Sequence, residues 1–129
     1  MIEIRKVEDP AIAKKICATH GIDYQENHRV IATLEGENIL HSAVFSYKNS
    51  EGNIYGIDGF EGDILLLDGL CRAILNIMDI QGVKVVYLPL KYKKLASYVG
   101  FSKDDDHYKL NLEGFFSCSC SSKKGRDDQ

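Results

Sequence analysis

A long helical pattern that lies between two predicted strands limits the fold more than any other part of the sequence. Its apolar residues recur at spacings of three and four, as on one face of a helix. They are Leu67, Leu70, Cys71, Ile74, Ile77 and Met78. The helix begins near Asp63, Gly82 marks its end, and Val83–Leu88 is a β-branched run typical of an interior strand covered on both faces. A strand predicted at Ile54–Ile57 precedes the helix, so we expect a parallel strand–helix–strand crossover.

The first half of the chain predicts one helix and an antiparallel meander. Residues 2–6 alternate between apolar and charged, which indicates a short strand. Asp9 and Pro10 follow as an N-cap and a first helical residue, and Gly21 ends the helix. The apolar stripe of this helix is Ile12, Ala13, Ile16 and Cys17. A loop, two paired strands and a second turn follow at Asp23–Asn27, Arg29–Leu34, Ile39–Tyr47 and Asn49–Asn53.

The last third of the chain predicts a short helix, a hairpin and a tail. The helix ends at Gly100, and its apolar face is Tyr92, Leu95, Ala96 and Val99. A hairpin of Phe101–Lys103 and His107–Leu112 closes around Asp104–Asp106, which we interpret as a solvated tip and not as a cation site. Residues 117–129 are small and polar, so we expect a disordered tail that contains cysteines.

Composition and charge exclude several classes of partner. The chain of 129 residues has the size of one domain, which we place at residues 1–116. A net charge of −3 and a pI of about 5.8 give no basic field for nucleic acid. No apolar run reaches the roughly 20 residues that cross a membrane, and the charged first residues do not resemble a signal peptide. We therefore expect a cytoplasmic protein with reduced cysteines that binds neither nucleic acid nor membranes.

The predicted order of elements is strand, helix, three strands, helix, strand, helix and two strands. Two short segments add to this pattern: Asp68–Leu75 followed by Gln81–Lys84, and Leu95–Phe101. With these features, residues 1–116 resemble the GNAT superfamily of N-acyltransferases. The resemblance implies an α+β fold with a mixed, mostly antiparallel twisted sheet flanked by helices. It also implies transfer of an acyl group from acetyl-CoA or another acyl-CoA to an amine of a small molecule or a peptide.

The resemblance places the cofactor's diphosphate at the start of the central helix. In the family this loop carries a basic residue and glycines, and its backbone N–H groups hold the diphosphate. The candidate cofactor-binding residues here are Gly62, Asp63, Leu65, Leu66 and Leu67. Leucines replace the glycines, Gly62 replaces the basic residue, and the Asp63 carboxylate is suited to cap the helix. The loop therefore departs from the family pattern where the cofactor would bind.

Two residues are candidates for proton transfer. Asp58 directly follows a predicted strand and could accept the proton of an amine, although a turn at Asp58–Gly59 is the alternative interpretation. The tyrosine that often serves as general acid in the family corresponds to Ala96. Tyr92 lies one helical turn earlier on the same face and could replace it, with a packing role as the alternative.

The remaining metal- and proton-binding side chains have weaker patterns. His41 is predicted to share a strand face with Ile39 and Phe45, which favours a core role. Cys118 and Cys120 could share a soft metal, but incidental thiols in an unstructured tail are the alternative. The other cysteines are predicted to lie on buried helix faces, so no metal site is expected.

Two functions follow from the sequence. The first is a divergent acyltransferase that acts on an unknown amine. The second is a catalytically inactive GNAT-like domain that binds a small ligand or a protein partner, which the altered loop favours. A homodimer is left open as the assembly.

Overall fold

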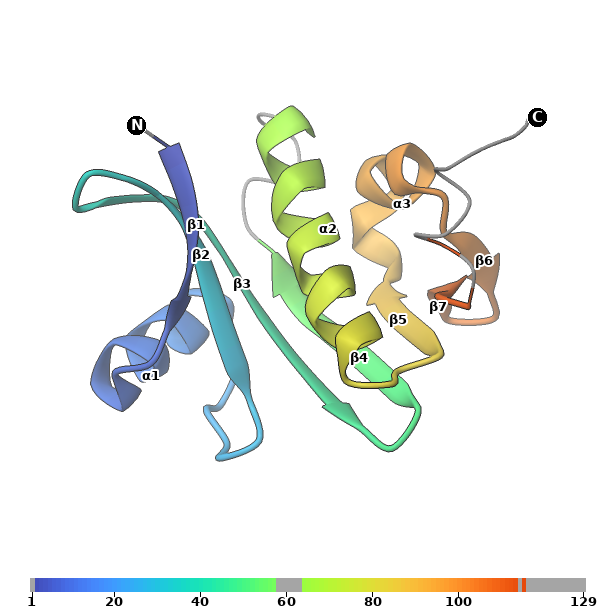
Figure 1. The fold of residues 1–129 in the computed structure, drawn as a ribbon, viewed down its shortest axis with the longest axis horizontal. Helices are drawn as coiled ribbons and strands as arrows, with labels where there is room; N and C mark the ends of the chain where they lie inside the picture. Colours follow the sequence, from blue (N-terminus) through green and yellow to red (C-terminus); the bar gives the residue numbers. More distant parts are fainter. Residues whose placement is uncertain (1, 58–63, 114, 116–129) are drawn as a thin grey trace.

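The computed structural model describes residues 2–57, 64–113 and 115, and within them seven strands form one sheet in the order β1-β2-β3-β4-β5-β7-β6 (Figure 1). The strands are β1 (Ile2–Val7), β2 (Arg29–Glu35), β3 (Asn38–Lys48), β4 (Glu51–Ile57), β5 (Val85–Pro89), β6 (Ser102–Asp104) and β7 (His107–Asn111). The helices are α1 (Pro10–Thr19), α2 (Ile64–Ile80) and α3 (Lys93–Val99), with a 3₁₀ turn at Leu90–Tyr92. The β4–β5 pair is parallel and the other pairs are antiparallel, which confirms the predicted mixed α+β fold.

Helix α1 covers the face of the first three strands opposite to α2. Asp9 caps its first turn by accepting a hydrogen bond of 2.9 Å from the Ala11 N–H. Its buried residues pack with side chains from β2 and β3: the cluster is Ala13, Ile16, Cys17, Val30 and Val44. Ile12 does not belong to this stripe and stays exposed. Position 12 lies about a quarter turn from the middle of the buried stripe, which explains why that prediction was wrong.

Helix α2 forms the main core together with α3 and the other face of the sheet. The helix packs directly on β4, because a Cβ atom added at Gly52 would lie 2.5 Å from the Met78 sulfur. Burial of Cys71 raises the pKa of its thiol to about 12, so the side chain behaves as a small apolar residue. The fully buried residues of α2 are Leu67, Leu70, Cys71, Ile74, Leu75 and Met78. The predicted stripe is confirmed, except that Ile77 is only half-buried and Leu75 is added.

The predicted starts of β4 and β5 are wrong, and both lie beside α2. Strand β4 begins at Glu51, and the turn before it is limited to Asn49 and Ser50. Gly52 belongs to the strand because only a residue without a side chain can lie against Met78. Strand β5 begins at Val85 and not at Val83.

Strand β5 is covered on one face only, contrary to the prediction for Val83–Leu88. Val86 and Leu88 lie in the core beneath the helices, whereas Val85 and Tyr87 on the opposite face are half-buried. The reason is that α1 packs mainly on β1, β2 and β3. No helix in the described part of the chain therefore covers the outer face of β5.

A bulge in β3 changes the predicted environment of His41. Thr33 pairs with His41 and Leu34 pairs with Ile39, so Leu40 is the extra residue and Ile39 points to the other face. Ile39 is accordingly exposed, and the prediction that it shares a face with His41 was wrong. His41 is half-buried.

The hairpin tip is shorter than predicted, because Asp104 belongs to β6 and is half-buried; Asp105 and Asp106 are exposed, with Asp105 in a left-handed conformation (φ 55°). None of the helices in the described part of the chain is long and apolar enough to cross a membrane. The predicted tail at residues 117–129 lies outside the described residues.

Candidate functional site

The parallel strands β4 and β5 part after three residue pairs. They pair over Glu51–Asn53 and Val85–Tyr87, and then continue to Ile57 and Pro89 outside the ladder. A bulge at Tyr55 adds to the divergence. Ile54 pairs with Phe45 of β3 and Gly56 pairs with Val44, so Tyr55 is the extra residue of β4. The parallel crossover predicted from the sequence is thus present, but it is open at the carboxyl end of both strands.

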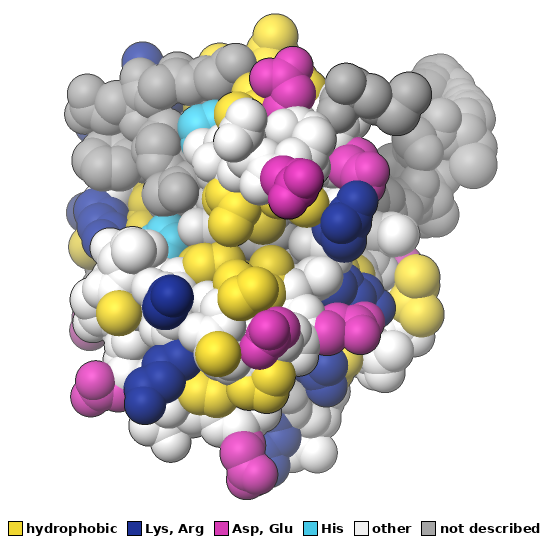
Figure 2. Space-filling view, turned by 90° about the vertical axis from the view of Figure 1, so that its left-hand side faces the viewer, with side chains coloured by type: hydrophobic (Ala, Val, Ile, Leu, Met, Phe, Trp, Pro, Cys, Tyr) yellow, Lys and Arg dark blue, Asp and Glu magenta, His cyan; other side chains and the backbone are white. Residues whose placement is uncertain are grey.

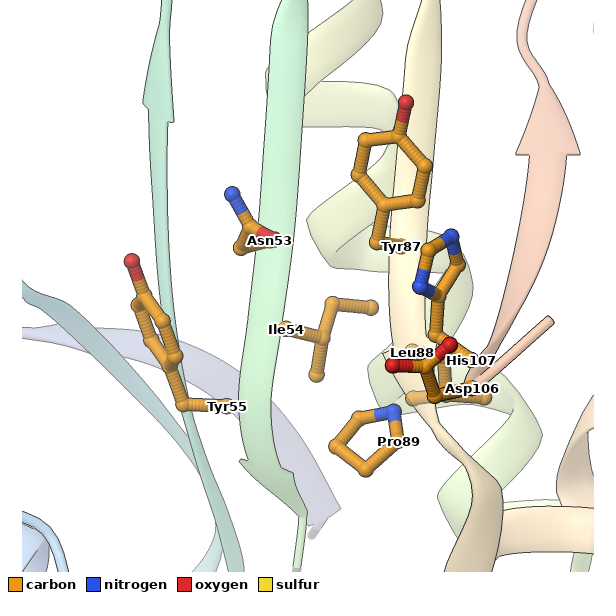
Figure 3. A pocket seen from close by; sticks show the side chains of 8 residues that line it. All are labelled: Asn53, Ile54, Tyr55, Tyr87, Leu88, Pro89, Asp106 and His107. Atoms are coloured by element: carbon orange, nitrogen blue, oxygen red, sulfur yellow. The ribbon is translucent and has the colours of Figure 1, made fainter. Parts of the chain in front are cut away.

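A pocket of about 400 Å³ lies at this opening. Asn53 and Tyr55 border it on the β4 side, and Tyr87 and His107 border it on the other side (Figure 3). Further lining residues are Ile54, Leu88, Pro89 and Asp106. The pocket lies on the outer face of the sheet, since Tyr87 and Asn53 alternate with residues of the core. A ligand can therefore enter without any rearrangement of α2 or α3.

Tyr92 closes the base of the opening. It follows β5 in the 3₁₀ turn, is 2% exposed, and its hydroxyl accepts a hydrogen bond of 3.0 Å from the backbone N–H of Ile57. The phenol thereby occupies a donor that a strand partner would otherwise use. Ala96, one turn later, is fully buried in the same core. The structure thus brings Tyr92 to the end of β4, directly before the predicted base Asp58, which lies outside the described residues.

The first turn of α2 contains three of the predicted cofactor-binding residues. The side chain of Leu65 is 66% exposed, Leu66 is half-buried, and Leu67 is fully buried in the main core. Leu67 therefore takes no space at the outer surface of the helix terminus, although it replaces a family glycine. Gly62 and Asp63 lie outside the described residues, as do the metal candidates Cys118 and Cys120.

His107 is the titratable side chain at the pocket that sequence reasoning missed. Its ring meets the Tyr87 ring edge-on at 4.6 Å, and its Nε2 atom lies 3.6 Å from a carboxylate oxygen of Asp104. This nitrogen is buried and has no hydrogen-bond partner in the described part of the chain. The carboxylates of Asp104 and Asp106 beside this ring can attract a cationic group. His107 reaches the pocket because the last hairpin pairs with β5, which places His107 opposite Pro89; knowledge of this pairing would have identified it.

A second histidine supports the bulge of β4 from the α1 side. His20 caps α1, and its Nε2 lies 3.0 Å from the Ser42 hydroxyl. The ring leaves no room for a side chain at Gly56, where an added Cβ would approach its Nδ1 to 2.9 Å. A side chain at position 56 would therefore have to displace the His20 ring.

A third histidine buttresses Tyr55, which lines the pocket. The rings of His28 and Tyr55 are 4.9 Å apart, and the Tyr55 hydroxyl is 2.7 Å from that of Ser46. Burial lowers the pKa of His28, and its Nδ1 atom accepts a hydrogen bond of 3.2 Å from the Gln25 N–H. The loop before β2 thus fixes one wall of the pocket. No group of three or more metal-binding side chains occurs among the residues that the structure describes.

We expect Gly56→Ala to destabilise the protein by about 1–3 kcal/mol, because the new methyl group displaces the His20 ring and disturbs its contact with Ser42. Gly69→Ala is the matched control, since nothing lies within 4 Å of a Cβ atom there. Gly69 is inside α2, so alanine should stabilise by about 0.5–1 kcal/mol. Urea denaturation measures both changes, and equal effects of the two variants would contradict the proposed packing at Gly56.

Comparison with known proteins places this geometry in a fold family. No family model and no curated protein matches the sequence. The structure is similar to the ribosomal-protein-S18-alanine N-acetyltransferase of Escherichia coli, with a TM-score of 0.65, 13% identity and coverage of 87% of this chain and 94% of that one. An acetyltransferase of the GNAT family from Staphylococcus aureus Mu50 gives a TM-score of 0.60, 12% identity and coverage of 87% and 99%.

Escherichia coli YhhK, solved in solution bound to coenzyme A, gives a TM-score of 0.61 at 13% identity, with coverage of 86% and 98%. The likeness covers nearly the whole length of each of these proteins, while the identities remain very low. The chain therefore has the fold of the GNAT acetyltransferases, in a divergent form, as its sequence resemblance predicted.

Proposed function

We propose that the protein transfers an acyl group from an acyl-CoA to an amine, with the thioester end of the cofactor in the opening between β4 and β5. The observation that carries this proposal is the parting of the two strands after Asn53 and Tyr87. An extended chain that bears amides, such as the pantetheine arm of coenzyme A, can add to a strand edge of this kind. The adjacent pocket of about 400 Å³ gives an acceptor access to the same place.

The residues at the base of the opening suit the acyl end of the cofactor. The bound thioester would supply the activated acyl group. The Ile57 N–H is a fixed donor in a buried position, as stabilisation of a carbonyl oxygen requires. Tyr92 has two roles at this site: its hydroxyl accepts the Ile57 hydrogen bond until a ligand displaces it, and a phenol so placed can return a proton to a leaving thiolate.

The outer face of the sheet suits the amine. An amine must lose a proton to become a nucleophile, and His107 offers an imidazole at the rim of the pocket. The neighbouring carboxylates of Asp104 and Asp106 favour the approach of an ammonium group. Asp58 stays a second candidate for the base, on the strength of its place after Ile57 in the sequence.

The start of α2 suits the diphosphate through its backbone. The first N–H groups of a helix attract anions, and the proposed contacts are the backbone groups of Leu65, Leu66 and Leu67, with Gly62 and Asp63 before them. Because Leu67 is buried in the core, its side chain does not block an anion at the start of the helix. The missing basic side chain predicts a weaker affinity than a loop with an arginine would give.

The second candidate function is an inactive domain that binds a small ligand or a protein. Its supporting observation is the hydrogen bond between Tyr92 and Ile57, which closes the base of the opening within the chain itself. The buried Ala96 at the position of the family tyrosine supports it too. Binding of an acyl-CoA at the opening distinguishes the two functions.

Calorimetric titration with acetyl-CoA tests the proposal, with three variants at the exposed Leu65. A negative charge at the helix terminus repels the diphosphate and a positive charge attracts it. We expect Leu65→Asp to weaken binding about tenfold relative to the neutral Leu65→Asn, and Leu65→Arg to strengthen it. No heat of binding at millimolar acetyl-CoA would overturn the acyltransferase proposal and favour the inactive domain. Equal affinities of all variants for acetyl-CoA would show that the diphosphate does not bind at the start of α2.

A further inference from the structure

Among the residues that the structure describes, strand β1 pairs on one side only and forms an edge of the sheet. It pairs with β2 on one side, and β1 is the last strand of the sheet in that direction. Five of its six residues are exposed, including Ile2 at 47% and Ile4 at 42%. The side of the molecule nearest to β1 presents apolar side chains among acidic and basic ones (Figure 2). An unpaired edge with apolar residues is a ready partner for another strand.

The two faces of β1 differ in chemistry. Lys6 lies opposite Ile31 of the main core, so Ile2, Ile4 and Lys6 point to the α2 side. Val7 lies opposite Val30 of the α1 cluster, so Glu3, Arg5 and Val7 point to the α1 side. Glu3 and Arg5 are neighbours there and form an exposed ion pair of 2.6 Å. One face of the edge is thus apolar with a lysine, and the other carries one charge of each sign.

These charges select one register for the pairing of β1 with a second copy of itself. Two copies that continue one antiparallel sheet must pair residues of the same face, so a twofold pair is centred on a residue. A centre at Glu3 puts two glutamates opposite each other, and a centre at Arg5 puts two arginines opposite each other. A centre at Ile4 pairs Glu3 with Arg5 of the other copy twice over, and pairs Ile4 with itself. It is the one register of the three without a pair of like charges.

We propose that two copies of this chain associate through β1 in the register centred on Ile4. The pairing joins the two sheets edge to edge and places Ile4 opposite Ile4 of the other copy, and Ile2 opposite its Lys6, on the α2 side. It leaves the opening between β4 and β5 free, because β4 is three strands away from β1 in the sheet. The proposal is independent of the proposed acyl transfer.

Sedimentation equilibrium of the full chain over a wide concentration range tests the proposal, with Glu3→Arg, Arg5→Glu and the double variant. Each single change puts like charges opposite each other twice, so we expect the dimer dissociation constant to rise about tenfold or more. The double variant exchanges the two charges and restores both opposite pairs. A mixture of the two single variants should also associate like the wild type, because every facing pair in that heterodimer is of opposite sign.

The side chains of Glu3 and Arg5 are both exposed, so the variants should fold with nearly the melting temperature of the wild type. Restored association in the double variant and in the mixture would support the register. A wild type that stays monomeric at the highest concentration, single variants that dimerise as well as the wild type, or a double variant as weak as the single ones would each overturn the proposal.

Discussion

Leu67→Asp is expected to unfold the protein, whereas the same change at Leu65 leaves it folded. Leu67 is fully buried in the main core, and a carboxylate there has no partner and no water. Burial of such a group costs several kcal/mol, which is a large part of the roughly 5–15 kcal/mol by which a domain is stable. Leu65 is 66% exposed in the first turn of α2, where a negative charge gains about 0.3–1 kcal/mol from the helix dipole.

Circular dichroism and urea denaturation of the two variants measure this difference. A folded Leu67→Asp protein with the wild-type midpoint would show that the Leu67 side chain lies at the surface. It would contradict the assignment of Leu67 to the core and of Leu65 to the exposed surface near the cofactor. The result also decides where the cofactor site can be tested. A charge at Leu67 cannot separate loss of binding from loss of folding, whereas a charge at Leu65 can.

Tyr92→Phe is the second change with a large expected effect. Removal of the hydroxyl leaves the buried N–H of Ile57 without its acceptor, which should destabilise the unliganded protein by about 1–3 kcal/mol. The same N–H becomes available to an acyl carbonyl without displacement of the phenol. We therefore expect acetyl-CoA to bind more tightly to the variant, by up to about tenfold, and to recover part of the lost stability.

Tyr98→Phe is the matched control, because Tyr98 is 49% exposed and the same hydroxyl is removed. Urea denaturation with and without acetyl-CoA measures the free energy of unfolding of each variant, and calorimetry measures its affinity for acetyl-CoA. An unchanged free energy of unfolding in Tyr92→Phe would show that the hydroxyl does not satisfy the Ile57 amide. Weaker binding of acetyl-CoA would show that Tyr92 holds the cofactor directly and does not compete with it.

The helices could be predicted from the sequence because their signals are local. The spacing of Leu67, Leu70 and Ile74 defines the buried face of α2 without any knowledge of its partners. Asp9 followed by Pro10 likewise fixes the start of α1. The order of these elements was then enough to identify the fold, since few topologies join strands and helices in this sequence.

The candidate site could be predicted only in part, because it depends on contacts between distant segments. The bulges at Leu40 and Tyr55 have no sequence signal, yet each shifts the face to which its neighbours point. His107 reaches the pocket through the register of β7 with β5, and His20 reaches Gly56 from the end of α1. Such placements follow from packing and not from local preference.

Amide chemical shifts can show directly whether an acyl-CoA binds in the opening between β4 and β5. Isotope-labelled protein would be titrated with acetyl-CoA and the backbone N–H signals followed by NMR spectroscopy. We expect the largest shifts at Ile57 and Leu88 in the opening and at Leu65 at the start of α2, and unchanged amide signals in β1. Absence of shifts at millimolar acetyl-CoA, or shifts confined to residues away from the opening, would contradict the proposed binding.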